Sequence, residues 1–265
     1  MRIDPLPPSN IAVLTEALRR HTCAVDTSDA PDAHIYAVVD QLFLPDAESR
    51  RRLAISQWPN HNLLDHLGGA GDHHSVFLVA LPKNGERLSA AIRRLCQACD
   101  GRPMLSFVVS RAPFAALAEH LRKYTEARLA PDDDEYLLRI GDTRVLSAIL
   151  NSLGDAQRVT LLAPLIAWLH IDRNGSLIET PGLDSPDRLA HDMPHLAPEH
   201  WQALIDAAWP DAVLAQLDPL APAAWQADLP SRRHAAVTQW LMEATEIGHD
   251  DPATQIAYCL SQLEI

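Results

Sequence analysis

Two arginines and an aspartate lie close together in the stretch LLRIGDTRVLSAIL, residues 137–150. Arg139 and Arg144 flank Asp142, with apolar residues on both sides of the group. Two cations around one carboxylate can form a catalytic group, an anion-binding site or a structural ion pair, because burial strengthens all three. Which of these applies decides whether this chain is an enzyme.

The stretch HNLLDHLGGAGDHH, residues 61–74, gathers side-chain types that bind zinc or iron. They are His61, Asp65, His66, Asp72, His73 and His74. His61 and His66 are five residues apart, so a helix would point them in different directions rather than at one ion. We therefore favour a solvated, glycine-rich loop without a metal. The alternative is a metal-dependent hydrolase that uses the His61–His74 cluster.

Cys96 and Cys99 match the pattern C-x-x-C, which does redox work when it opens a helix. Here the pair lies near the end of the helical pattern GERLSAAIRRLCQACDG, where the helix dipole disfavours a thiolate. The sequence has no second C-x-x-C and none of the motifs G-x-G-x-x-G, G-x-x-x-x-G-K, G-x-S-x-G or H-E-x-x-H. We predict no cofactor and no catalytic residue, although thirteen histidines leave a serine–histidine–aspartate arrangement open.

Three short apolar runs predict buried strands at residues 34–40, 76–81 and 104–110. Helical patterns follow the last two of these runs, and strands that alternate with helices indicate an α/β fold. Residues 124–141 predict a hairpin with its turn at Pro131–Asp134, which makes a mixed sheet. The predicted fold class is therefore α/β, a mixed β-sheet with flanking helices.

Two helices are predicted next, at residues 142–154 and 155–169, and a last hairpin turns at Asn174-Gly175. The segment PGLDSPDR then suggests a boundary between an α/β domain, residues 1–182, and a smaller helical C-terminal lobe, residues 183–265. Three amphipathic patterns predict a small helix bundle in this lobe. Its tryptophans are mostly expected in the core, and those that could anchor a partner are Trp201, Trp209 and Trp225.

The negative charge of the chain is concentrated in its last third. Of the net charge of −13, residues 183–265 carry −10, from 13 acidic and 3 basic side chains. Nucleic acids and anionic membranes attract basic surfaces, so neither is expected as a partner. A basic protein surface is the better match. The sequence has no leader-like or membrane-spanning apolar run, so we expect a cytoplasmic protein with reduced thiols.

Residues 117–180 resemble the type VI secretion effector adaptor chaperones. The matching motifs are His120-Leu121-Arg122, then Leu137-Leu138-Arg139, then Asp142 with Arg144-Val145-Leu146. The strand IYAVVD with its following LPD, and the pattern HWQALIDAAWPDAVLAQL, extend the likeness over residues 34–217. Thr143 departs from the family proline, and Ile140-Gly141 replace bulkier, often aromatic residues.

The resemblance implies a non-enzymatic adaptor that binds a cognate effector toxin in the cytoplasm and promotes its loading onto the VgrG spike protein. It also implies that Arg139, Asp142 and Arg144 form a structural motif. We expect Asp142 to cap the helix that it opens and both arginines to pair with carboxylates. A regulatory or scaffold protein with other partners is a third alternative.

Overall fold

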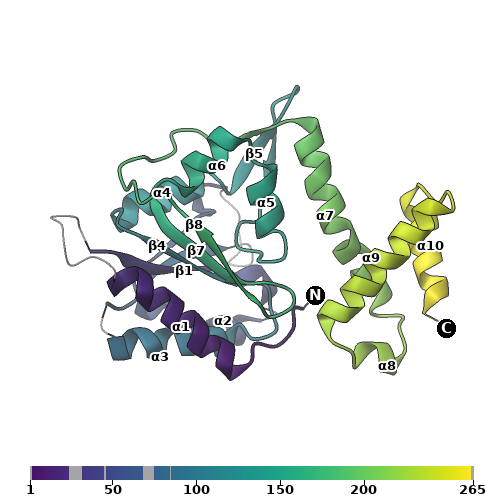
Figure 1. The fold of residues 1–265 in the computed structure, drawn as a ribbon, viewed down its shortest axis with the longest axis horizontal. Helices are drawn as coiled ribbons and strands as arrows, with labels where there is room; N and C mark the ends of the chain where they lie inside the picture. Colours follow the sequence, from purple (N-terminus) through teal and green to yellow (C-terminus); the bar gives the residue numbers. More distant parts are fainter. Residues whose placement is uncertain (1, 24–31, 45, 68–74, 84, 264–265) are drawn as a thin grey trace.

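The computed structural model describes residues 2–23, 32–44, 46–67, 75–83 and 85–263. Strands alternate with helices over the first two thirds of the chain, and helices follow (Figure 1). The strands are β1 (His34–Asp40), β2 (Asn60–Asn62), β3 (Val76–Ala80), β4 (Leu105–Ser110), β5 (Glu126–Leu129), β6 (Asp134–Leu137), β7 (Leu165–Ile171), β8 (Leu177–Pro181) and β9 (His195–Leu196). The helices are α1 (Pro8–Cys23), α2 (Ala47–Leu53), α3 (Gly85–Ala98), α4 (Phe114–Arg122), α5 (Leu146–Ser152), α6 (Asp155–Leu162), α7 (Pro198–Leu217), α8 (Ala223–Gln226), α9 (Pro230–Glu246) and α10 (Pro252–Gln262), with single 3-10 turns at Gln41–Phe43, Ile55–Gln57 and Asp65–Leu67.

Six strands form the main sheet in the order β2-β3-β1-β4-β7-β8, and neighbouring strands are antiparallel. Alternate residues of β1 point to opposite faces, and both faces are buried. Ile35, Ala37 and Val39 pack in one core with α1, α2 and α3, whereas Tyr36 and Val38 pack in a second core with α4, α5 and α6. The sheet is therefore covered by helices on both faces.

Strands and helices alternate along the sequence because strands of the main sheet that run in the same direction need a connection between them. β3 and β4 both pair antiparallel with β1, so they run in the same direction and α3 connects them. A smaller sheet has the order β6-β5-β9, in which β5 pairs antiparallel with β6 and parallel with β9. The predicted α/β fold class is confirmed, with the mixed pairing in the small sheet.

The structure confirms the strands predicted near residues 34–40, 76–81 and 104–110, and both predicted hairpins. The prediction of one helix over residues 155–169 is wrong, because α6 ends at Leu162 and β7 begins at Leu165. Pro164 accounts for the break, since proline has no backbone N–H to continue the helix and its ring would clash with the carbonyl group four residues earlier. Apolar residues on both sides of the break hid this change from the sequence pattern.

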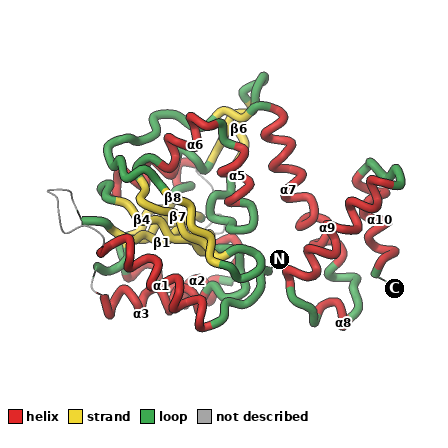
Figure 2. The backbone as a smooth tube through the Cα atoms, viewed as in Figure 1, coloured by secondary structure: helices red, strands yellow, loops and turns green. Residues whose placement is uncertain are grey.

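The C-terminal helices α8, α9 and α10 lie together at one side of the molecule (Figure 2). With α7 they form a third core around Val213, Leu217, Val237, Leu241 and Cys259. The start of α7 packs instead on the α/β part, through Trp201 and Leu204. The first residues of the chain also reach the helical lobe, because Asp4 accepts hydrogen bonds from the backbone N–H and hydroxyl of Ser231 at 2.9 and 2.6 Å. Thus α7 spans the junction between the two parts.

Candidate functional site

The three residues of the motif at residues 139–144 lie together in the loop between β6 and α5. The guanidinium of Arg144 donates two hydrogen bonds to the carboxylate of Asp142, with N–O distances of 3.0 and 2.7 Å, in a bidentate ion pair. Both side chains are at most 5 % exposed. An Asp142 carboxylate oxygen also accepts the backbone N–H of Arg144 at 3.1 Å. This short turn therefore fixes both the backbone and the guanidinium plane of Arg144.

Asp211, from the middle of α7, joins this pair to the rest of the protein. Its carboxylate binds Arg173 in the β7–β8 turn at 2.9 and 2.5 Å, and Arg144 at 3.2 Å. Burial opposes ionisation of Asp211, but the two arginines outweigh it and hold its pKa below the usual value. Asp211 is thus an ionised carboxylate that ties α7 to two separate loops of the α/β part.

Arg139 occupies the outer end of the cluster. Its guanidinium binds Asp40, at the end of β1, at 2.9 Å and lies 3.7 Å from Asp142. Both Arg139 and Arg144 lie over the ring of Phe43, with the guanidinium carbon 4.7 and 5.3 Å from the ring centre. Burial raises the pKa of Asp40, and the charge of Arg139 opposes that rise. Phe43 therefore serves as a shared platform for the two arginines.

Gly141 makes this close packing possible. A Cβ atom at this position would lie 2.7 Å from Cβ of Asp40 and 3.2 Å from a methyl group of Val76. Gly141 therefore lets the loop press against the end of β1.

The predicted helix cap at Asp142 is wrong. α5 begins at Leu146, its N-cap residue is Val145, and no side chain caps it. Asp142 accepts the N–H of Arg144 one turn earlier, so it stabilises the entry to the helix rather than the helix end. The prediction that both arginines pair with carboxylates is confirmed, and the cluster is built as a network of internal ion pairs.

An open groove lies beside the cluster, between α5 and α7, and we call it the α5–α7 groove. Its volume is about 350 Å³, and its lining includes Leu138, Val145, Ile149, Leu204 and Ala208, with Trp201 and Ile205. The side chains of Arg139, Asp142, Arg144 and Asp211 line its polar end. A surface of this shape suits an apolar segment of another molecule.

The structure separates the three tryptophans proposed as anchors. Trp201 lines the α5–α7 groove, and its ring lies 4.5 Å from that of Tyr136. Trp209 and Trp225 pack against the C-terminal core, and their ring N–H groups bind Gln255 and Asp218 at 2.8 and 3.2 Å. A contact between any of the three and a partner stays a prediction, and the geometry favours Trp201.

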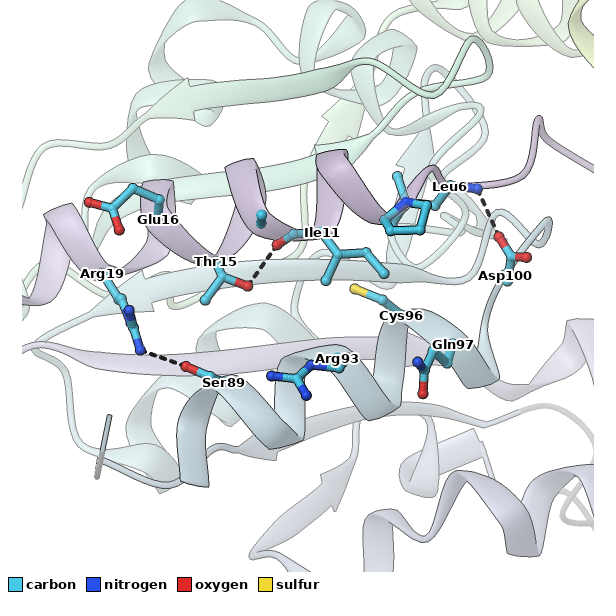
Figure 3. Close-up of a pocket in the computed structure, with 12 residues that line it drawn as sticks. Leu6, Ile11, Thr15, Glu16, Arg19, Ser89, Arg93, Cys96, Gln97 and Asp100 are labelled. Atoms are coloured by element: carbon cyan, nitrogen blue, oxygen red, sulfur yellow. Dashed lines mark hydrogen bonds between the residues drawn. The ribbon is translucent and has the colours of Figure 1, made fainter. Parts of the chain in front are cut away.

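A larger groove lies between α1 and α3, with a volume of about 960 Å³ (Figure 3). A hydrogen bond between Arg19 and Ser89 crosses one end, and one between the backbone of Leu6 and Asp100 crosses the other. Cys96 lies on its floor, and burial raises the pKa of this thiol to about 12. Because the thiol stays protonated at neutral pH, it is a poor nucleophile, and the cysteine pair packs as core.

The histidine-rich stretch supplies two histidines that pair with carboxylates. His66 lies 2.6 Å from Glu126, and His61 lies 3.8 Å from Asp65. Asp72, His73 and His74 fall outside the described residues. Among the residues that are described, no three histidine, cysteine or acidic side chains come together as a metal site.

Comparison with known proteins gives one match, and it covers part of the ion-pair cluster. None of the described helices is long and apolar enough to cross a membrane. No curated protein and no solved structure matches the chain significantly. Residues 35–159, which include Asp40, Phe43 and the whole loop from Arg139 to Arg144, match the family described as "Domain of unknown function (DUF4123)", a domain known in effector adaptor proteins of type VI secretion systems.

Proposed function

We propose that this protein is a non-enzymatic adaptor that binds a cognate type VI secretion effector in the cytoplasm and promotes its loading onto the VgrG spike protein. The match over residues 35–159 is the observation that carries the proposal, because that domain is known in such adaptors. The resemblance of residues 117–180 to the same family supports it. The proposal includes neither nucleic acid nor membrane as a partner.

The geometry of the ion-pair cluster supports a structural role for the residues that first suggested catalysis. Asp40, Asp142 and Asp211 each form an ion pair with an arginine of the same chain, so each carboxylate is already partnered inside the protein. Asp142 and Arg144 are almost wholly buried, which leaves little of either for a substrate. The cluster fixes α7 against the α/β part, and α7 in turn forms one wall of the α5–α7 groove.

Co-expression tests this function. The probe is a candidate toxin taken from the reading frames that neighbour this gene, in a catalytically inactive form, expressed alone and with the adaptor. We expect the adaptor to raise the soluble yield of the toxin and to co-purify with it, and the VgrG protein of the same gene cluster to join the complex.

An unrelated acidic protein of similar size, expressed with the same toxin, is the control for a general effect on solubility. An unchanged toxin yield together with no co-purification would overturn the proposal. Hydrolysis of a substrate by the purified protein would favour the enzyme alternative.

A further inference from the structure

We propose that the arginine-rich surface of α2 and α3 binds an acidic segment of the partner protein, with one carboxylate of that segment in a pocket beside α2. The identity of the partner rests on the proposed adaptor function, and the inference adds the chemistry and the place of the contact. It follows from the uneven charge of the chain, the contacts of the arginines and the lining of the pocket.

Positive charge is concentrated on two neighbouring helices. α2 and α3 pack side by side on one face of the main sheet (Figure 1). With the cap residue of α2 they carry six arginines, Arg50, Arg51, Arg52, Arg87, Arg93 and Arg94, and three acids, Asp46, Glu48 and Glu86. Their net charge is +3, and because the whole chain carries −13, the remaining residues carry −16. We call the six arginines the α2–α3 arginine surface, and all of them except the half-buried Arg50 are exposed.

The packing of the two helices holds these arginines close together. Arg94 of α3 donates a hydrogen bond to the backbone carbonyl of Arg52 in α2 at 3.4 Å. Glu48 pairs with Arg52. Among the ion pairs that join residues in the described part of the chain, none includes Arg50, Arg51 or Arg94. Like charges held this close repel one another, so an acidic ligand relieves the repulsion as well as adding attraction.

A pocket beside α2 has a lining that suits one carboxylate. It lies between α2 and the strands β2 and β3, its volume is about 380 Å³, and Arg50 and Arg51 both line it. Ser56 and Ser75 add hydroxyl groups, which can donate hydrogen bonds. Among the described residues that line this pocket, none is acidic. Guanidinium groups recognise a carboxylate through short, charge-assisted hydrogen bonds, and here no lining carboxylate competes for them.

The limited extent of the surface favours a short protein segment over a nucleic acid or a membrane. α3, the longer of the two helices, has 14 residues, which at a rise of roughly 1.5 Å each gives about 21 Å. A much longer polyanion would extend past the arginines and meet the rest of the chain, with its charge of −16. About seven extended residues, at roughly 3.3 Å each, cover the same length and can place their carboxylates only where the arginines lie.

A defined peptide tests the inference without knowledge of the effector. The probe is a labelled peptide of about twelve residues in which glutamate alternates with serine, titrated against the full protein by fluorescence anisotropy. The comparison ligands are the same peptide with glutamine in place of glutamate, and a labelled DNA duplex of about 30 base pairs. We expect only the glutamate peptide to bind, and we expect its affinity to fall as the salt concentration rises.

Variants place the contact on the α2–α3 arginine surface. Arg52 and Arg232 are a matched pair, because their side chains are 75 and 72 % exposed and each pairs with an acid four residues earlier. Arg52→Glu should fold normally and lower the affinity about tenfold, since a repulsion replaces an attraction. Arg232→Glu, on α9, changes the net charge equally and should alter the affinity less than about twofold. Arg51→Gln removes one of the two charges that line the pocket and should lower the affinity about fivefold.

Binding of the glutamine peptide or of the DNA as tight as that of the glutamate peptide would overturn the inference. An absence of binding, or an equal loss in Arg52→Glu and Arg232→Glu, would do the same. The toxin assay separates this failure from that of the proposed function. If the toxin co-purifies equally with wild type and with the double variant Arg51→Gln, Arg52→Glu, the adaptor function stands and the surface inference falls. If the glutamate peptide binds at these arginines but the toxin does not co-purify, the reverse holds.

Discussion

Replacing Asp211 by asparagine removes the one carboxylate that α7 shares with two arginines. Asparagine keeps the shape of the side chain, so the change acts mainly on charge. Arg144 retains its bidentate pair with Asp142, whereas Arg173, only 14 % exposed, loses its two bonds to a carboxylate. Breaking a buried pair costs about 3–5 kcal/mol. Because only one arginine is left unpaired and it is not fully buried, we expect about 3 kcal/mol.

Thermal unfolding followed by circular dichroism measures this loss. For a protein of this size, 1 kcal/mol shifts the midpoint by about 2–4 °C, so Asp211→Asn should melt roughly 6–12 °C below wild type. Asp206→Asn is the matched control, because Asp206 lies on the exposed side of the same helix and bonds only to Gln202 among the contacts described. It should stay within about 2 °C.

A double variant tests the cause as well as the size. Arg173→Met with Asp211→Leu removes both charges, so it should recover part of the stability lost in Asp211→Asn. A midpoint for Asp211→Asn within 1 °C of wild type would refute the view that this carboxylate holds α7 in place.

Three further changes are expected to act through the same fold. Asp142→Ala should lower the melting midpoint, because it leaves Arg144 without its bidentate partner; a normal midpoint combined with loss of an enzymatic activity would contradict the structural role. Gly141→Ala should cost about 1–3 kcal/mol in urea unfolding, since the new methyl group would overlap Asp40, and a cost near zero would contradict the packing described. Burial lowers the pKa of His170 from 6.5 to about 4, so the unfolded chain takes up a proton first as the pH falls. The stability should therefore drop by about 3 kcal/mol between pH 6.5 and 4, and His170→Leu should flatten that slope.

The sequence was sufficient for the local elements because their signals are local. The apolar run at β1 and the Asn174-Gly175 turn each depend on a few adjacent residues. Whether the strands of the main sheet pair parallel or antiparallel could not be predicted in the same way. Alternating strands and helices are typical of parallel sheets, but here β3 and β4 pair antiparallel on either side of β1, and the other strands of the main sheet continue the antiparallel pattern. Both faces of this antiparallel sheet are still covered by helices.

Only part of the ion-pair cluster could be predicted. Arg139, Asp142 and Arg144 are close in sequence, whereas Asp40 lies 99 residues from Arg139, which it binds. Asp211 lies 67 residues from Arg144 and 38 residues from Arg173. No local pattern links such residues. One signal did exist, since Asp211 interrupts the mainly apolar stretch AAWPDAVLA, where a carboxylate needs a partner if it is buried.

The residues that join the α/β part to the helical lobe are synthesised at different times. Arg144 and Arg173 leave the ribosome before Asp211, and Ser231 emerges later still, although it binds Asp4 from the segment that precedes α1. The α/β part can therefore collapse early, but one wall of the groove arrives only with the final third. The complete α5–α7 groove therefore exists only after Ala212, the last of its lining residues, has left the ribosome.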